Sequence, residues 1–423
     1  MNIEDNLGDP QDINCDFDPK SISVEQALLQ IMAQIKPVTQ VETIALRAAL
    51  GRVIAVDLQS RVKVPNHTNS AMDGYAVAGS ELPVKNQQDF VIAGISFAGK
   101  PFRGEVAAGQ CVRIMTGAVM PVGCDTVVTQ ERVVRNEDII TVNAGEQAGS
   151  NVRQAGEDLE VGDVAISKGI RIGPAHLGLA ASLGFSEIPV YRKPRIAFFS
   201  TGDELKSVGE QLETGELYDS NRYTLYGMLT EAGVEIVDLG IVRDDPQGIR
   251  KAFIEAADCA DMVITSAGAS VGDADYVKQT LDELGAVSFW KVAVKPGRPL
   301  AFGTVDKSLF FGLPGNPVSV MVTYQIFVRQ AIRKLSGEIQ QQALTIKVPL
   351  SSQLKKRRGR VEYQRGVLLK NALGQTEVAT TGEQGSGILH SMSVANCFIL
   401  LSAESEGAGP GDLVEVIPFT QSF

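Results

Sequence analysis

The sequence is poor in cysteine and histidine, with five cysteines and three histidines among its 423 residues. The cysteines lie far apart along the chain, at Cys15, Cys111, Cys124, Cys259 and Cys397. No two of them form a C-x-x-C pair, which argues against a zinc or iron–sulfur site held by the protein. An odd number of isolated thiols also argues against a disulfide framework and favours a reducing compartment.

The sequence also lacks long apolar runs and an excess of basic residues. No run approaches the roughly 20 apolar residues that a membrane-spanning helix needs. The first nineteen residues hold six acidic residues and no Lys or Arg, the opposite of a secretory signal. The net charge of −11 argues against nucleic acid as a ligand, because phosphate backbones attract basic surfaces. We therefore expect a cytoplasmic protein that binds neither membranes nor nucleic acid.

The residue pattern divides the chain into regions that differ in composition and in hydrophobic periodicity. Residues 1–20 are polar and acidic and predict a mobile arm. Ser23 and Gln26 form a capping box for a helix that Pro37 closes. Residues 61–155 hold short β-type runs between glycine and proline turns, which predict a small β domain. Residues from about 341 onward return to β-type sequence, with a basic run at 355–360 that predicts a solvated face.

Between these β-type regions, strands and helices alternate. The pattern predicts strands at 195–200, 234–239 and 261–265, and helices that begin near Asn221, Pro246 and Tyr276. The first of these helices has Asp219 or Ser220 as its N-cap and Gly233 just past its end. A long helix from Pro317 to about Lys334 follows. Such alternation predicts a parallel sheet covered by helices on both faces. Ligands of such sheets bind beyond the carboxyl ends of the strands, which here are the loops after residues 200, 239 and 265.

The loop at 265–275 is rich in glycine and serine, and it joins a predicted strand to a predicted helix. Small residues allow a ligand to approach the backbone, and amide groups at a helix start attract anions. Acidic residues also follow each of the three strands, at Glu204, Asp244 and Asp275. Carboxylates beside a phosphate site suit Mg²⁺. The alternative is that the loop is a plain connector and that these acids are turn or cap residues.

Two lysines could complete such a site. Lys291 and Lys295 flank Val292-Ala-Val in what reads as one strand. A separation of four places both on one face, about 13 Å apart at strand rise. Facing the acids, they could hold an anion between themselves and a metal. The alternative is a solvated edge strand, which lysine often marks.

Eight segments, in this order, resemble the molybdopterin molybdotransferase (MoeA) family, which is related to the C-terminal part of gephyrin. They are Ser70-Ala-Met-Asp-Gly-Tyr-Ala, Arg113-Ile-Met-Thr-Gly-Ala, Gly156-Glu-Asp, Ser200-Thr-Gly-Asp-Glu-Leu, Arg243-Asp-Asp-Pro, Ser270-Val-Gly-Asp-Ala-Asp-Tyr, Lys295-Pro-Gly-Arg-Pro and Gly312-Leu-Pro-Gly-Asn-Pro-Val. Two positions depart from the family's usual pattern: Thr68 stands where it has Asp, and Ala267 replaces a glycine of the phosphate loop.

The resemblance implies a multidomain α/β plus β fold. Its core is a three-layer α/β domain with a parallel-type sheet, joined by a β-rich inserted domain and a C-terminal β-barrel-like domain. Applied to this chain, it implies a molybdopterin-binding domain at 21–36 and 191–340. A two-segment linking domain would span 37–60 and 156–190, the inserted domain 61–155 and the C-terminal domain 341–423. Residues 1–20 remain the arm.

The resemblance also implies an activity, which is the insertion of molybdate into adenylylated molybdopterin with Mg²⁺ and release of AMP. It implies a homodimer whose active cleft lies between the α/β domain of one subunit and the C-terminal domain of its partner. Transient contact with molybdopterin adenylyltransferase is expected as well. Two alternatives remain open. One is an adenylyltransferase-like enzyme that uses ATP on molybdopterin, and the other is a non-catalytic scaffold like gephyrin.

The resemblance finally implies roles for individual residues. Glu204, Asp244 and Asp275 would hold Mg²⁺ and act in catalysis together with Lys291 and Lys295, which would bind molybdate or the pterin phosphate. The other substrate-binding residues that it implies are Ser266, Gly268, Ser270, Asp158, Thr116, Arg298, Pro314, Asn316, Arg365 and Ser386.

Overall fold

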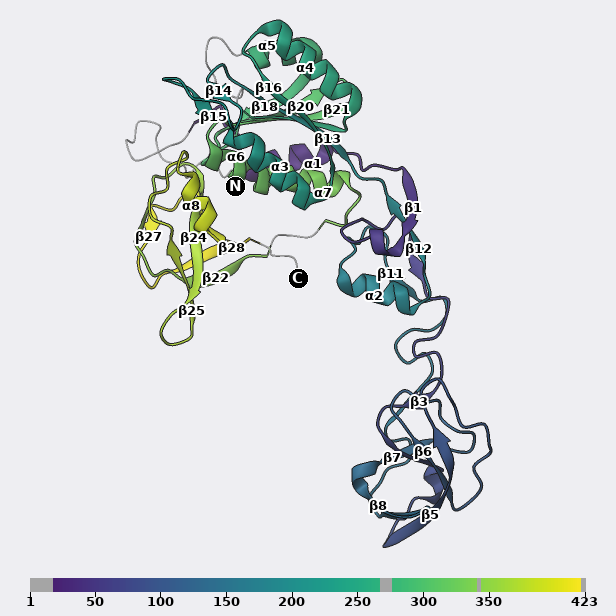
Figure 1. Cartoon of the computed structure of the whole chain (residues 1–423). Helices are drawn as coiled ribbons and strands as arrows, with labels where there is room; N and C mark the ends of the chain where they lie inside the picture. Colours follow the sequence, from purple (N-terminus) through teal and green to yellow (C-terminus); the bar gives the residue numbers. More distant parts are fainter. Residues whose placement is uncertain (1–17, 267–275, 341–343, 420–423) are drawn as a thin grey trace, which may run out of the picture. The chain divides into compact units, whose positions relative to one another are not determined.

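The computed structural model describes residues 18–266, 276–340 and 344–419. The chain forms two compact units (Figure 1). The first unit comprises residues 1–42, 51–53 and 190–423, and the second comprises residues 43–50 and 54–189. Gly268, Ser270 and Asp275, together with the Ala267 departure, lie outside the described residues, as does most of the predicted arm.

A six-stranded sheet forms the centre of the first unit, in the order β16-β13-β17-β21-β20-β18. Four neighbouring strands are parallel: β16 (Glu235–Val242), β13 (Arg195–Thr201), β17 (Met262–Ser266) and β21 (Ser308–Leu313). The other two, β20 (Pro299–Val305) and β18 (Gly285–Lys291), are antiparallel to their neighbours. The predicted parallel sheet is therefore correct for four strands and wrong for two. The reason is local, because Asp306 and Lys307 make a tight hairpin that leaves no room for a crossover.

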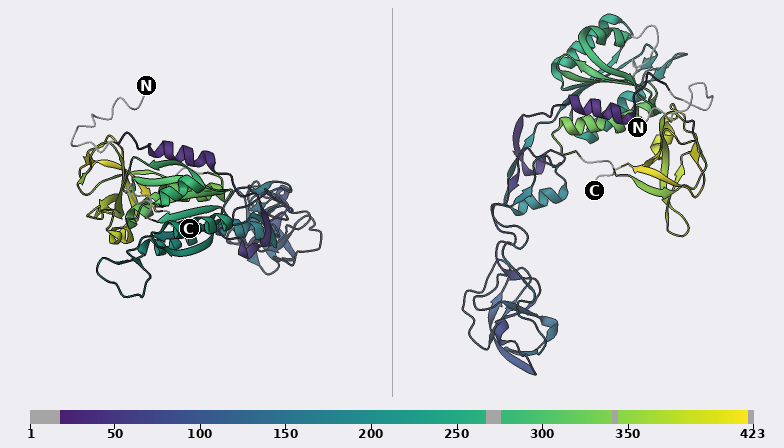
Figure 2. Two further views of the ribbon diagram at one scale, coloured as in Figure 1. Left: turned by 90° about the horizontal axis from the view of Figure 1, so that it is seen from above. Right: turned by 180° about the vertical axis from the view of Figure 1, so that it is seen from behind.

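Helices cover both faces of this sheet (Figures 1 and 2). On one face lie α1 (Val24–Gln34), α3 (Ser220–Ala232), α6 (Pro317–Thr323) and α7 (Arg329–Leu335), and on the other lie α4 (Pro246–Cys259) and α5 (Tyr276–Leu284). Successive side chains of a strand point to opposite faces. Phe198 accordingly packs in the core with α1 and α3, while Phe199 packs in the core with α4. Strands buried on both faces explain the continuous apolar runs in the sequence.

Several helix ends agree with the sequence prediction. The Ser23–Gln26 capping box is present at the start of α1. Asp219 caps α3, which ends at Gly233 in the left-handed conformation, with φ of 73°. Pro246 opens α4 behind the Asp245 cap. The long helix predicted from Pro317 is continuous, but residues 324–328 between α6 and α7 form a π-helical turn.

A second sheet of the first unit is built mainly from the C-terminal region. Its order is β19 (Val294–Lys295), β24 (Val361–Lys370), β26 (Cys397–Leu401), β28 (Leu413–Pro418) and β22 (Ile346–Pro349), and β25 (Thr376–Thr380) pairs with β24. A bridge between Leu350 and Val378 links the β22 end of the sheet to β25. The strand predicted across Lys291–Lys295 is wrong, because Lys291 ends β18 of the central sheet whereas Lys295 lies in this second sheet.

The second unit contains a six-stranded sheet in the order β7-β4-β6-β5-β9-β8. Its strands are β7 (Thr126–Thr129), β4 (Gly74–Val77), β6 (Gln110–Ile114), β5 (Gln87–Ser96), β9 (Ile139–Asn143) and β8 (Val133–Asn136). The Asp73 carboxylate, just before β4, accepts hydrogen bonds from the Thr116 amide at 2.7 Å and from its hydroxyl at 2.8 Å. The loop before β4 and the loop after β6 therefore form one joined corner.

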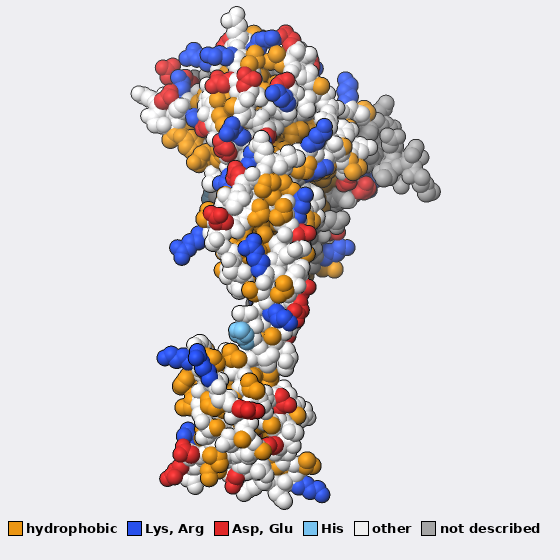
Figure 3. Space-filling view, turned by 90° about the vertical axis from the view of Figure 1, so that its right-hand side faces the viewer, with side chains coloured by type: hydrophobic (Ala, Val, Ile, Leu, Met, Phe, Trp, Pro, Cys, Tyr) orange, Lys and Arg blue, Asp and Glu red, His pale blue; other side chains and the backbone are white. Residues whose placement is uncertain are grey.

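Charged residues are distributed over the surface of both units. On the described part of the face in Figure 3, Lys and Arg are interspersed with Asp and Glu. Within the basic run, Lys356 departs from the predicted solvated face. It is only 9% exposed, and its ammonium donates to the carbonyls of Arg357, Ala403 and Ser405. In the described ranges, no helix has the length and apolar character needed to cross a membrane.

Candidate functional site

A polar cavity of about 830 Å³ opens beyond the carboxyl ends of the parallel strands in the first unit. Glu204 follows β13, Ser266 ends β17, and the turn at 314–317 follows β21. This is where doubly wound sheets bind ligands, and the volume suits a small molecule. Among the described residues, seven of those predicted from the sequence line the cavity: Glu204, Ser266, Lys295, Arg298, Pro314, Asn316 and Ser386.

Three carboxylates gather near the ends of β13 and β16. The Asp244 amide donates to the Asp203 carboxylate at 3.3 Å. Burial raises the pKa of Asp244, and the negative charges of Asp203 and Glu204 raise it further. Oxygen donors that repel one another fit a divalent cation such as Mg²⁺, which would relieve the repulsion. Within the described residues no three His, Cys, Asp or Glu side chains are arranged to hold a metal, and the third predicted ligand, Asp275, lies outside them.

At the end of β17 the cavity is lined by Ser266, whose hydroxyl contacts a buried serine of the neighbouring strand. Ser266 is 1% exposed, and its hydroxyl lies 2.9 Å from the Ser200 hydroxyl, which is fully buried. This pair joins the ends of β17 and β13, which are neighbours in the sheet. Ser266 therefore joins the ends of the two strands at the point in the sequence where the glycine-rich loop begins.

The cationic residues have acidic partners within the chain. The Lys295 ammonium lies 2.9 Å from the Glu362 carboxylate, which is almost fully buried. Arg298 pairs with Asp18, and Lys291 approaches the same Asp18 oxygen at 3.5 Å. Lys295 and Arg298 line the cavity, whereas Lys291 does not. The structure thus brings two of the three basic groups to the cavity, and Lys291 instead lies beside Asp18.

Arg365 occupies a position that sequence reasoning could not foresee. It is fully buried, and burial lowers the pKa of its guanidinium. The guanidinium donates to the Ser391 hydroxyl and to the carbonyls of Glu383, Gln384 and Gly385. These bonds fix the backbone of residues 383–385, which directly precede Ser386 at the cavity. Arg365 therefore shapes the cavity from behind and has no open face for a substrate.

Asn221 is a site residue that the sequence reasoning missed. Its amide nitrogen donates to the Gly315 carbonyl at 2.7 Å, which fixes the turn at 314–317 against the start of α3. Ser386 reinforces the same turn, because its carbonyl accepts the Val318 amide at 3.1 Å. In a sequence, an asparagine at the start of a helix is a weak indication of such a role, because asparagines there usually cap the helix itself.

Two predicted site residues belong to the second unit. Thr116 is held by Asp73 in the corner described above, and Asp158 is exposed, with its amide bonded to the Val64 carbonyl. Neither residue lines the cavity of the first unit.

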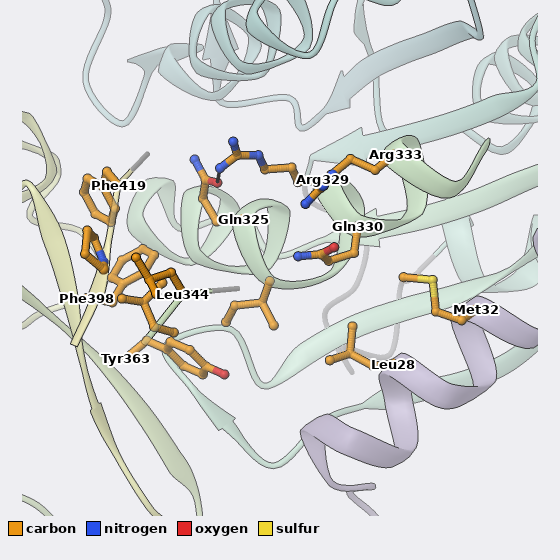
Figure 4. Close-up of a pocket in the computed structure, with 13 residues that line it drawn as sticks. Leu28, Met32, Gln325, Arg329, Gln330, Arg333, Leu344, Tyr363, Phe398 and Phe419 are labelled. Carbon is orange, nitrogen blue, oxygen red and sulfur yellow. Dashed lines mark hydrogen bonds between the residues drawn. The ribbon is translucent and has the colours of Figure 1, made fainter. Parts of the chain in front are cut away.

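A second cavity of the first unit, of about 540 Å³, is mostly apolar. Figure 4 shows Leu28 and Met32 of α1 on one side and the aromatic rings of Tyr363, Phe398 and Phe419 on the other. None of the predicted catalytic or substrate-binding residues that the structure describes lines it. The polar cavity is therefore the candidate active site.

Comparison with known proteins covers nearly the whole chain. Residues 22–184 match the MoeA N-terminal region (domain I and II), residues 197–334 a probable molybdopterin binding domain, and residues 347–419 the MoeA C-terminal region (domain IV). The "Molybdopterin molybdenumtransferase" of Haemophilus influenzae is 42% identical over 400 residues, which is 94% of this chain and 98% of that protein. The chain belongs to the MoeA family. A Staphylococcus aureus member of the same name is 30% identical over 400 residues, covering 94% of this chain and 95% of that protein.

The fold agrees with that of solved members of the MoeA family. The crystal structure of the molybdopterin biosynthesis MoeA protein from Pyrococcus horikoshii matches with a TM-score of 0.82. Its sequence is 27% identical, and the match covers 95% of this chain and all of that one. The polar cavity draws most of its lining from the region that matches the molybdopterin binding domain.

Proposed function

We propose that this chain inserts molybdate into adenylylated molybdopterin with the help of Mg²⁺ and releases AMP, a transferase step of molybdenum cofactor biosynthesis. The observation that supports it best is the polar cavity, which lies largely within the region matching a molybdopterin binding domain. The full-length relatives are named molybdopterin molybdenumtransferase. A single adenylyltransferase domain would not account for the matches to the N-terminal and C-terminal MoeA regions.

The charges of the cavity suit an anionic substrate with a phosphoanhydride. Lys295 would bind the negative charge of the pterin phosphate or molybdate, Arg298 would bind the AMP side of the phosphoanhydride, and the turn at 314–317 would hold the substrate in place. Glu204 and Asp244, with Asp275, would hold Mg²⁺ on the opposite rim. When bound, the metal would neutralise charge on the departing AMP. Ser266 begins the loop whose Gly268 and Ser270 would cradle the nucleotide.

Finer features of the architecture belong to the same proposal. We propose a three-layer core, with the domain boundaries given above, because helices cover both faces of the central sheet. We propose a barrel-like C-terminal domain, which the Leu350–Val378 bridge supports. We also propose a cytoplasmic location, in keeping with the free thiols of Cys111, Cys124, Cys259 and Cys397.

The quaternary proposal is a homodimer that makes transient contact with molybdopterin adenylyltransferase. The sequence resemblance places the C-terminal domain of a partner subunit at the cleft. In the structure, Gly385 and Ser386 of the same chain already line the cavity. The dimer proposal therefore rests on the family alone, and sedimentation of the purified protein tests it.

The activity is tested by following AMP release from adenylylated molybdopterin with molybdate and Mg²⁺. We expect release to require both, and to fall at least tenfold in Arg298→Met. A matched control is Lys307→Met, at the exposed β20–β21 hairpin, which we expect to leave turnover unchanged. Consumption of ATP with free molybdopterin would instead favour the adenylyltransferase alternative. Absence of either reaction in the folded protein would favour the scaffold.

A further inference from the structure

Asp18 lies between two cations of the first unit. Its carboxylate pairs with the Arg298 guanidinium, and the same oxygen lies 3.5 Å from the Lys291 ammonium. The Asp18 side chain is 14% exposed, so the carboxylate is mostly withdrawn from solvent, whereas the Arg298 side chain is 39% exposed. Arg298 lines the polar cavity, whereas Asp18 and Lys291 do not. The carboxylate therefore contacts Arg298 without lining the cavity itself.

The backbone around Asp18 is fixed to the end of β18. The Ile22 amide donates to the Lys291 carbonyl at 3.2 Å, and the Ala293 amide donates to the Ile22 carbonyl at 2.8 Å. The Lys20 amide donates to the second Asp18 carboxylate oxygen at 2.9 Å. Both carboxylate oxygens are thus engaged, and the segment at 18–22 holds the carboxylate in one orientation. Such anchoring is what a positioning group requires.

The ionisation of Asp18 agrees with this arrangement. Burial alone would raise the pKa of Asp18. The Lys20 amide and the charges of Arg298 and Lys291 outweigh burial and lower the pKa to about 2. The carboxylate is therefore ionised throughout the neutral range.

We infer that Asp18 is a positioning residue that orients the Arg298 guanidinium toward the anionic substrate, with Lys291 holding Asp18 in place. This inference rests on the proposed function. Fixing a long arginine side chain in one conformation costs conformational entropy. A carboxylate that binds one edge of the guanidinium holds it in place, and the N–H groups of the other edges then point away from that carboxylate. It also gives Lys291 a different role from the one the sequence suggests, because Lys291 acts through Asp18 rather than on the substrate.

The test compares Asp18→Asn with wild-type protein in two measurements. One is the split between KM for adenylylated molybdopterin and kcat, and the other is the Kd of AMP as a probe by calorimetry. We expect KM and the AMP Kd to rise about five- to tenfold, with kcat changed less than about twofold. Asp18→Glu should recover part of the affinity. Glu25→Gln, an exposed acid at the start of α1, is the control and should match wild type.

A double-mutant cycle then separates positioning from a general charge effect. If Asp18 acts through Arg298, Asp18→Asn should have no further effect on AMP affinity in an Arg298→Gln background. An equal effect in both backgrounds would overturn the inference. So would a lower KM in Asp18→Asn, since that would show Asp18 competing with the substrate for the cations.

Failure of the inference and failure of the proposed function give different results. Wild-type protein that neither binds AMP nor releases it would refute the proposed function. If Arg298→Gln weakens AMP binding while Asp18→Asn binds like wild type, only the role of Asp18 is refuted. Should Asp18→Asn fail to fold by circular dichroism, Lys291→Gln replaces it. We expect that variant to weaken AMP binding in the same direction, and wild-type affinity would overturn the inference.

Discussion

The Lys295 ammonium forms an ion pair with the Glu362 carboxylate at 2.9 Å, joining β19 to β24. Glu362 is 3% exposed, and its other oxygen accepts a hydrogen bond from Gln364 at 2.9 Å. The side chain of Lys295 is much more open and lines the polar cavity. One lysine therefore neutralises a buried charge and also presents its cation to the candidate substrate.

This double role predicts that stability and activity can be separated at Lys295. Lys295→Met leaves a buried carboxylate without its cation, which we expect to lower the free energy of unfolding by about 1–3 kcal/mol. The partial exposure of Lys295 keeps this below the cost for a fully buried pair. Turnover should also fall, because the cavity loses a cation. Urea unfolding and AMP release measure the two effects.

The double variant Lys295→Met with Glu362→Gln provides the control. Removing the unpaired carboxylate should restore the free energy of unfolding to within about 1 kcal/mol of wild type. It should not restore turnover. Recovery of turnover in the double variant would show that Lys295 acts only by neutralising Glu362.

A second prediction concerns Arg365. Its guanidinium satisfies a hydroxyl and three carbonyls in a fully buried position. Arg365→Met leaves these four acceptors without this donor, at about 1 kcal/mol or more each, so we expect a loss of about 4 kcal/mol or more in unfolding free energy. Chemical denaturation measures it. Ser386→Ala, at the cavity end of the same segment, should leave stability within about 0.5 kcal/mol. Equal stability of Arg365→Met and wild type would contradict the assigned role.

Local signals in the sequence predicted much of the central fold. Helix ends at Ser23, Asp219, Gly233 and Pro246 depend on capping and on backbone preferences within a few residues, and these appear directly in the sequence. The antiparallel strands β18 and β20 were missed because their pairing is decided by a two-residue hairpin and by long-range partners. The break between Lys291 and Lys295 likewise depends on Ile22, which lies far away in sequence.

The candidate site was predictable in its residue types but not in its arrangement. Acids and glycines after parallel strands point to the edge of the sheet where the cavity lies. Whether a basic residue faces the cavity or lies behind it depends on tertiary contacts. Lys291 and Arg365 were expected beside the substrate, yet the first pairs with Asp18 and the second is enclosed by its own chain. The sequence pattern alone does not show which residues a basic side chain will contact in the folded chain.

A third prediction concerns the corner that Asp73 and Thr116 form in the second unit. The amide and the hydroxyl of Thr116 both donate to Asp73 and lower the pKa of its carboxyl from the usual 3.8. Because the pKa of Asp73 is lower in the folded state than in the unfolded state, the ionised carboxylate stabilises the fold when the pH is above the unfolded-state pKa. This contribution is lost as the pH falls below about 4. Thr116→Val removes the side-chain bond and should lower the free energy of unfolding at pH 7, whereas Thr116→Ser should have little effect. The difference in unfolding free energy between Thr116→Val and wild type should shrink as the pH approaches 3. A difference that stays constant with pH would contradict this explanation.

The last prediction concerns the reactivity of the buried thiols. Cys111 and Cys397 are fully buried in the cores of the second and first units, and burial raises their pKa values to about 12 and about 11. At pH 8 the thiolate of Cys397 would be about one part in a thousand, and only the thiolate reacts with disulfide reagents. In a Cys15→Ser, Cys124→Ser, Cys259→Ser background, we expect no native labelling by such a reagent within an hour, and two thiols after denaturation. Removal of the other cysteines makes each labelled thiol assignable by mass spectrometry. Rapid native labelling of Cys111 alone would show that the second unit opens independently, because its core and that of the first unit are separate hydrophobic clusters.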